Sequence, residues 1–166
     1  VLVTDRSAGA TAPAEGARGF EVEALDGDTA SLFERGMRRA SALGRKVLAT
    51  GRDMALRRPV VVIGSCWDYA HALFTRAGFG ERKRARPHKG PKQGPYLDAG
   101  LIEPGDWLYF RNRSYGNIEH SAVFVEWINR PSRVALMISY PGQRRSVPAR
   151  VRPYELTGVY SITRPI

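Results

Sequence analysis

The order of hydrophobic patterns along the chain is the feature that most restricts its fold. The first half carries the spacing typical of helices, whereas the second half carries short apolar stretches separated by turn residues, which is typical of strands. Helices followed by consecutive strands predict an α+β fold, with N-terminal helices packed on an antiparallel β-sheet. The predicted strands are residues 106–112, 120–128, 133–140 and 158–164.

The first predicted helix covers residues 28–57, with Asp28 as its N-cap. Its apolar and small residues recur at alternating steps of four and three, which places them on one face. Glycine weakens a helix but lets a neighbouring element approach closely, so we expect such an approach, and a possible break, near Gly44 or Gly51. The residues of this face are Phe33, Met37, Ala40, Gly44, Val47, Gly51 and Met54.

The length of 166 residues and the 43% of hydrophobic residues predict one domain with a core that needs no disulfide. We expect this domain to cover residues 19–166. Residues 1–18, rich in Ala, Gly and Thr, are predicted to form a flexible tether or a processed segment. No apolar run approaches the roughly 18 residues of a membrane span, and no signal peptide is visible. The net charge of +10 predicts attraction to nucleic acid, acidic lipid or an anionic envelope polymer.

The only cysteine of the chain, Cys66, excludes an intramolecular disulfide. A lone cysteine is usually a small buried hydrophobic residue, commonly in the middle of a helix. Cys66 instead follows a loop and cap formed by Gly64 and Ser65, and it begins a predicted helix that ends at Gly78. Backbone N–H groups at a helix start favour a thiolate and can stabilise an oxyanion. Cys66 is therefore a candidate nucleophile.

A cysteine nucleophile needs a base, and the chain has three histidines. His71 lies five residues after Cys66 on the same helix and points to a different side. His88 lies in a basic segment, residues 80–95, which reads as a solvated loop. His120 begins an apolar strand, and a rigid strand can direct an imidazole towards the start of a helix. His120 is therefore the candidate base.

Five segments in this order resemble the NlpC-type papain-like cysteine peptidases. That family has a cysteine that opens a helix, a Pro-Gly-Asp turn into an apolar strand, and a histidine at the head of the next strand. The resemblance covers about residues 60–165. The segments are GSCWDYAHALFTRAGF, LIEPGDWLYF, HSAVFVEW, ALMISYPG and VYSITRP.

The resemblance implies a peptidase or amidase that cleaves an amide of peptidoglycan peptide, in the periplasm or outside the cell, without a cofactor. Cys66 matches the nucleophile and His120 the base of this family. A third polar residue, which orients the imidazole, falls at Ser139, where the family usually has His, Asn, Gln or an acid; Tyr140 is the neighbouring alternative, although strand alternation would point it the other way. The residues expected to contact the substrate flank these positions and are Ser65, Trp67 and Tyr140.

The chain departs from the family pattern around the cysteine. The family usually has Asp before the cysteine and Ser-Gly after it, whereas Ser65 precedes and Trp67 and Asp68 follow here. The family also has an upstream Tyr that helps to recognise the substrate, and residues 48–65 contain none. Related papain-like branches cleave other amides or act on acyl chains, so the bond that is cleaved stays open.

Two other readings remain from the residues alone. One is a basic module without catalysis that binds nucleic acid or an anionic envelope polymer through residues 80–95, although no aromatic residue interrupts this segment before Tyr96. The other is a family member that keeps the fold but has lost activity. A metal hydrolase or a serine hydrolase lacks its motif here, since HExxH, CxxC and GxSxG are all absent. Further cations that would join the basic surface are Arg111, Arg113, Arg144 and Arg145.

Overall fold

The computed structural model describes residues 2–5, 27–141 and 147–166. Its helices are α2 (Gly27–Arg39), α3 (Ala42–Arg52), which continues into a π-helical turn (Asp53–Arg57), and α4 (Cys66–Arg76). Its strands are β1 (Leu2–Asp5), β2 (Val60–Ile63), β3 (Arg84–Lys89), β4 (Trp107–Asn112), β5 (Ile118–Asn129), β6 (Val134–Ser139), β7 (Arg150–Glu155) and β8 (Val159–Pro165). Short 3₁₀ turns cover Glu81–Lys83 and Ala99–Leu101.

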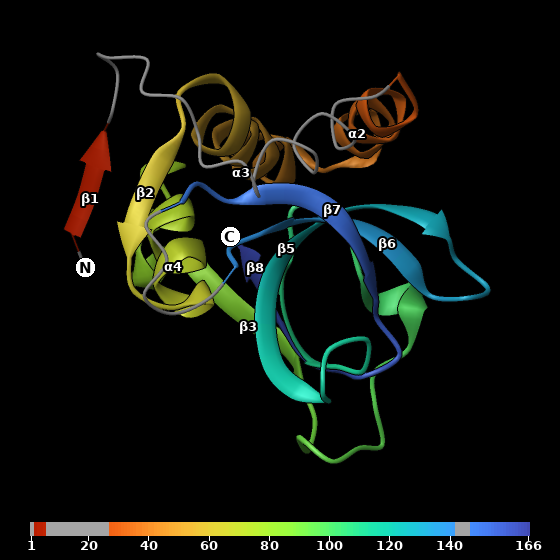
Figure 1. Cartoon of the computed structure of the whole chain (residues 1–166). Helices are drawn as coiled ribbons and strands as arrows, with labels where there is room; N and C mark the ends of the chain where they lie inside the picture. The colour runs from red at the N-terminus through yellow and green to blue at the C-terminus, as the bar shows by residue number, and fades with distance from the viewer. Residues whose placement is uncertain (1, 6–26, 142–146) are drawn as a thin grey trace.

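Six of these strands form one antiparallel sheet in the order β3-β8-β4-β5-β6-β7, and β1 and β2 form a separate antiparallel pair. The α+β prediction is therefore confirmed, because helices precede an antiparallel sheet and pack on it (Figure 1). Within the described residues, none of the helices combines the length and the apolar character that crossing a bilayer requires.

Alternation along the strands divides the core into two parts. Trp107 of β4 belongs to a cluster between the sheet and the helices, and its neighbour Leu108 belongs to a second cluster on the opposite face. Val123 and Phe124 of β5 are divided in the same way. Figure 1 shows the strands curving round on the side away from the helices, where this second cluster fills the space.

The predicted helix over residues 28–57 is interrupted at Ala40 and Ser41, not at a glycine. Ser41 caps α3, and its Oγ accepts a hydrogen bond from Gly44 N at 3.0 Å. The expected close approach at the glycines is confirmed: a Cβ at Gly44 would lie 2.4 Å from the carbonyl oxygen of Pro104, and one at Gly51 would lie 2.5 Å from a methyl carbon of a core isoleucine. The break follows the cap because serine competes with the helix for backbone N–H groups.

Three further segments form strands that were not predicted. Leu2–Asp5 pair with β2, whereas the other residues of the predicted tether, 1 and 6–18, lie outside the described residues, as do residues 19–26. Arg84–Lys89 form an edge strand rather than a loop, with a register shift between Ala85 and His88. Strand β7 was not predicted, because its sequence RVRPYE is charged and contains proline, which an edge strand tolerates.

Candidate active site

Cys66 is placed by a capping box at the start of α4. Ser65 is the N-cap: its backbone N–H donates to Asp68 Oδ2 at 2.7 Å, and its Oγ accepts from Asp68 N at 3.4 Å. The first of these bonds is the main reason that the pKa of Asp68 lies below its ordinary value. The hydrogen bond from Tyr69 N to Ser65 O is the first backbone bond of the helix. The N–H groups of Cys66 and Trp67 come before it and therefore have no acceptor within the helix. The thiol thus sits beside backbone donors suited to an anion.

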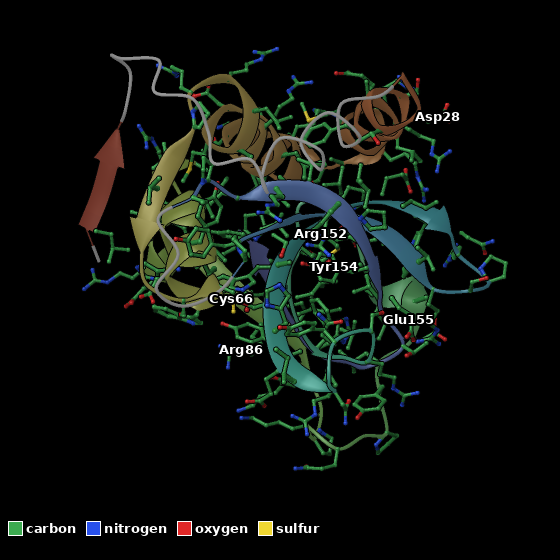
Figure 2. All side chains as sticks on the ribbon, in the orientation of Figure 1. Asp28, Cys66, Arg86, Arg152, Tyr154 and Glu155 are labelled. Atoms are coloured by element: carbon green, nitrogen blue, oxygen red, sulfur yellow. The ribbon has the colours of Figure 1, made fainter. Side chains whose placement is uncertain are left out.

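Two cavities meet at the cysteine. The smaller, of about 370 Å³, and the larger, of about 780 Å³, share Cys66, Glu119 and His120 in their walls. Cys66 is partly exposed, and Figure 2 shows it on the side of α4 that faces β5. The candidate nucleophile and the candidate base therefore line the same two cavities.

His120 is held by a chain of hydroxyl groups on the two neighbouring strands. Its Nε2 lies 2.8 Å from Ser139 Oγ on β6, and Ser139 Oγ lies 2.8 Å from Tyr154 Oη on β7. The imidazole ring also packs against Tyr154, at 5.4 Å between ring centroids, and meets Phe110 edge-on at 5.5 Å. These contacts restrict the ring and leave Nδ1 as the nitrogen that the serine does not occupy.

Burial, and after it the positive charge of Arg152, lowers the pKa of His120 to about 4. Arg152 lies on β7 with its guanidinium 5.2 Å from the ring centroid of Tyr154, and Figure 2 shows the two side chains together. At neutral pH the imidazole is therefore uncharged and can accept a proton.

The structure brings most of the predicted site residues together. Ser139 contacts His120 directly, Ser65 lines the larger cavity, and Trp67 lines the smaller one. Tyr140 is the exception, and its expected contact with substrate is corrected. Its side chain is 1% exposed and stacks on Tyr69, at 5.2 Å between ring centroids. Alternation along β6 turns Ser139 towards the imidazole and the next residue into the core between sheet and helices.

Several side chains around the cavities were not predicted from the sequence. Tyr154 and Arg152 were missed because β7 was missed. Tyr109 and Tyr160 line the smaller cavity. The one sequence signal for Tyr109 was strand alternation, which places it on the opposite face of the sheet from its buried neighbour Leu108. Most residues that line the two cavities come from segments that are far apart in the sequence, so the spacing of residues along the chain does not reveal them.

The other two histidines lie apart from this arrangement, as their sequence positions suggested. His71 stacks on Trp67 at 4.8 Å between ring centroids, and its Nδ1 lies 3.0 Å from an Arg84 guanidinium nitrogen. His88 lies on the edge strand β3. Among the predicted cations, Arg144 and Arg145 lie outside the described residues.

Comparison of the chain with protein-family models, with curated proteins and with solved structures found no match in any of the three. The geometry of the site and the motif resemblance are thus the grounds for a functional hypothesis.

Proposed function

We propose that this protein is a papain-like cysteine hydrolase of the NlpC type, a peptidase or amidase that cleaves an amide in the peptide part of peptidoglycan. One observation supports this most directly: Ser139 holds Nε2 of His120 at 2.8 Å, while the same histidine shares both cavities with Cys66. A cysteine hydrolase needs a nucleophile, a base and a residue that orients the base, and Cys66, His120 and Ser139 would take these three roles in that order. The proposed place of action is the periplasm or the outside of the cell.

The first half of the reaction forms a thioester. His120 takes the thiol proton of Cys66 on Nδ1 as the sulfur attacks the carbonyl carbon, and the carbonyl π electrons move to the oxygen. The backbone N–H of Cys66 and its neighbour at the start of α4 stabilise this oxyanion. Collapse of the intermediate breaks the carbon–nitrogen bond, and the imidazolium returns its proton to the leaving amine.

The second half releases the acid. Water attacks the thioester carbonyl while His120 accepts a proton from it, and the carbon–sulfur bond then breaks to restore the thiol. A low pKa keeps the imidazole neutral before each attack, so it acts as a base in both halves. Because the two cavities meet at Cys66 and His120, we place the scissile bond there, with substrate groups extending into both cavities.

Digestion of purified peptidoglycan tests this proposal. Wild type, Cys66→Ala and His120→Asn are compared, and the released fragments are identified by mass spectrometry. We expect new amine and acid ends from wild type only, and His88→Asn, a change on the edge strand, should leave the fragments unchanged. Identical fragments from wild type and Cys66→Ala would remove the peptidase proposal.

The second candidate is a basic binding module with weak or no catalysis. It is favoured by the net charge of +10 and by three cations, Arg86, Lys89 and Lys92, along one cavity. Such a module would be retained on DNA or on an anionic envelope polymer with a steep dependence on salt, and Cys66→Ala would not change its retention. This result, together with no peptidoglycan cleavage, would favour the module over the enzyme.

A further inference from the structure

A row of polar residues crosses four strands on the floor of the smaller cavity. Lys89 of β3 pairs with Ser161 of β8, Ser161 pairs with Tyr109 of β4, and Tyr109 pairs with Ser121 of β5. All four residues line this cavity, together with Cys66. Directly opposed residues of neighbouring antiparallel strands are about 5 Å apart, so the row forms a continuous polar surface that leads towards the thiol.

Two hydroxyl groups in this row have no partner in the described part of the chain. Ser121 is 3% exposed and Ser161 is 4% exposed, and the Oγ atom of each lacks a hydrogen bond there. A buried polar group without a partner is unfavourable for folding, and native proteins satisfy nearly all such groups with protein, water or ligand. Two such hydroxyls in one row on the cavity floor leave hydrogen-bonding capacity there that the described protein does not use.

The charges around the row favour an anion. Glu119 is the acidic member among the described cavity residues, and it is occupied by Lys92 Nζ at 2.8 Å and by Tyr160 Oη at 3.3 Å. In the described part of the chain, neither Arg86 nor Lys89 forms an ion pair with an acidic side chain. Figure 2 shows Arg86 beside Cys66 on the same side of the molecule.

The two tyrosines add neutral donors to these cations. Burial raises the pKa of Tyr109, and burial followed by the charge of Glu119 raises that of Tyr160 to about 12, so both hydroxyls stay protonated. Arg86 lies over the ring of Tyr109, with its guanidinium carbon 5.8 Å from the ring centroid. Cations and hydroxyl donors together suit carboxylate or phosphate oxygens. The larger cavity, in contrast, has two acidic residues, Glu119 and Glu155, beside two cations, Arg150 and Arg152.

We propose that the smaller cavity is a subsite for an anionic group, a carboxylate or a phosphate, next to the carbon that Cys66 attacks. Calling this group part of the substrate rests on the proposed function, whereas binding of the anion beside the thiol does not. Arg86 and Lys89 supply the charge, and the hydroxyls of Ser121, Ser161 and Tyr109 supply hydrogen bonds. The larger cavity accepts the other side of the substrate.

Alkylation of the single thiol tests the subsite without any turnover. Three maleimides of similar size are compared: N-ethylmaleimide, 3-maleimidopropionate and 2-maleimidoethyl phosphate. In each reaction the sulfur adds to the carbon–carbon double bond and the adjacent carbon takes a proton. Second-order rate constants are measured by mass spectrometry at low salt, and each is divided by that of N-acetylcysteine methylamide as a neutral reference thiol.

For at least one anionic maleimide, we expect the normalised rate constant at Cys66 to be about fivefold larger than that of N-ethylmaleimide. Two positive charges about 8 Å from the anion would produce an effect of this size in water. This preference should fall with added salt. The larger of the carboxylate and phosphate preferences identifies the anion. Equal ratios at Cys66 and at the reference thiol would overturn the proposal, and so would a failure of N-ethylmaleimide to react, since Cys66 would then not open into the cavity.

A matched pair of double variants separates local from general charge effects. Arg86→Gln/Lys89→Gln should abolish the preference, whereas Arg38→Gln/Lys46→Gln removes two exposed charges from α2 and α3 and should retain it. Equal loss in both would overturn the subsite. A retained preference without peptidoglycan cleavage would remove the proposed function alone, and cleavage without a preference would remove the subsite alone.

Discussion

His120 Nε2 lies 2.8 Å from Ser139 Oγ, although the two residues are 19 positions apart and lie on neighbouring strands. A hydroxyl orients an imidazole less strongly than a carboxylate, because it carries no charge. Here the serine is itself held by Tyr154 Oη at 2.8 Å, so its position is defined from both sides. The pair therefore restricts the ring through geometry rather than through charge.

Removal of the serine hydroxyl should weaken this restriction. We expect Ser139→Ala to lower kcat/KM by roughly tenfold or more, because Nε2 of the buried imidazole loses its partner. Tyr154→Phe should cause a smaller loss, and Ser139→Asn should restore part of the activity. The measurement is kcat/KM on a peptide fragment of peptidoglycan. Ser132→Ala, in an exposed turn, is the control, and equal activity of Ser139→Ala and wild type would contradict the role.

The pH dependence should follow the low pKa of His120. Because only the neutral imidazole accepts a proton, we expect kcat/KM to rise with pH through about 4 and to show no rise near 6.5 that belongs to this residue. Arg152→Gln removes a nearby positive charge and should move the rise to higher pH. NMR titration of the ring, assigned with His120→Asn, measures the same pKa directly. A wild-type midpoint near 6.5 would show that the ring is not buried as described.

The same shift affects stability. The folded-state pKa of about 4 lies below the ordinary value of 6.5, so protonation favours the unfolded chain. The contribution of His120 is fully present above pH 6.5 and is lost as the pH falls through 4. We therefore expect wild type to lose more free energy of unfolding than His120→Gln between pH 7 and pH 4, as measured by urea denaturation. Parallel losses in both proteins would contradict this account.

The capping box should support both the helix and the thiol. We expect Ser65→Ala to lower the free energy of unfolding by about 1 kcal/mol, because the first turn of α4 loses its cap. The alkylation rate of Cys66 should also fall, since its N–H donors become less ordered. Ser41→Ala removes the equivalent cap of α3 and should cost similar stability without changing that rate. An unchanged rate in Ser65→Ala would separate the cap from the reactivity of Cys66.

Close packing of α3 predicts a contrast between two glycines. A Cβ at Gly44 would lie 2.4 Å from the backbone oxygen of Pro104, which cannot move easily, whereas nothing lies within 4 Å of one at Gly80. We expect Gly44→Ala to destabilise the protein by about 1–3 kcal/mol despite the better helix propensity of alanine. Gly80→Ala should stay within about 0.5 kcal/mol of wild type. Urea denaturation measures both, and equal values would contradict the close approach.

Some parts of the site could be predicted from local sequence. Ser65 and Asp68, three residues apart, are sufficient to start α4 at Cys66, because a capping box depends on one turn of chain. Periodicity likewise placed Gly44 and Gly51 on the packed face, and both sit in close contacts. The break in the helix was predicted near a glycine but lies at Ser41. Glycine and serine both disfavour a helix, and only the packing decides where the chain turns.

By itself, then, the sequence determined that helices precede an antiparallel sheet, that Cys66 lies at a helix start and that His120 lies near a strand start. Only the tertiary structure decided that β7 brings Tyr154 to Ser139, and that four strands align Lys89 with Ser121 across a cavity floor. The physical reason is range. Caps and periodic faces depend on residues within a few positions, whereas strand order and register depend on how distant apolar faces pack together.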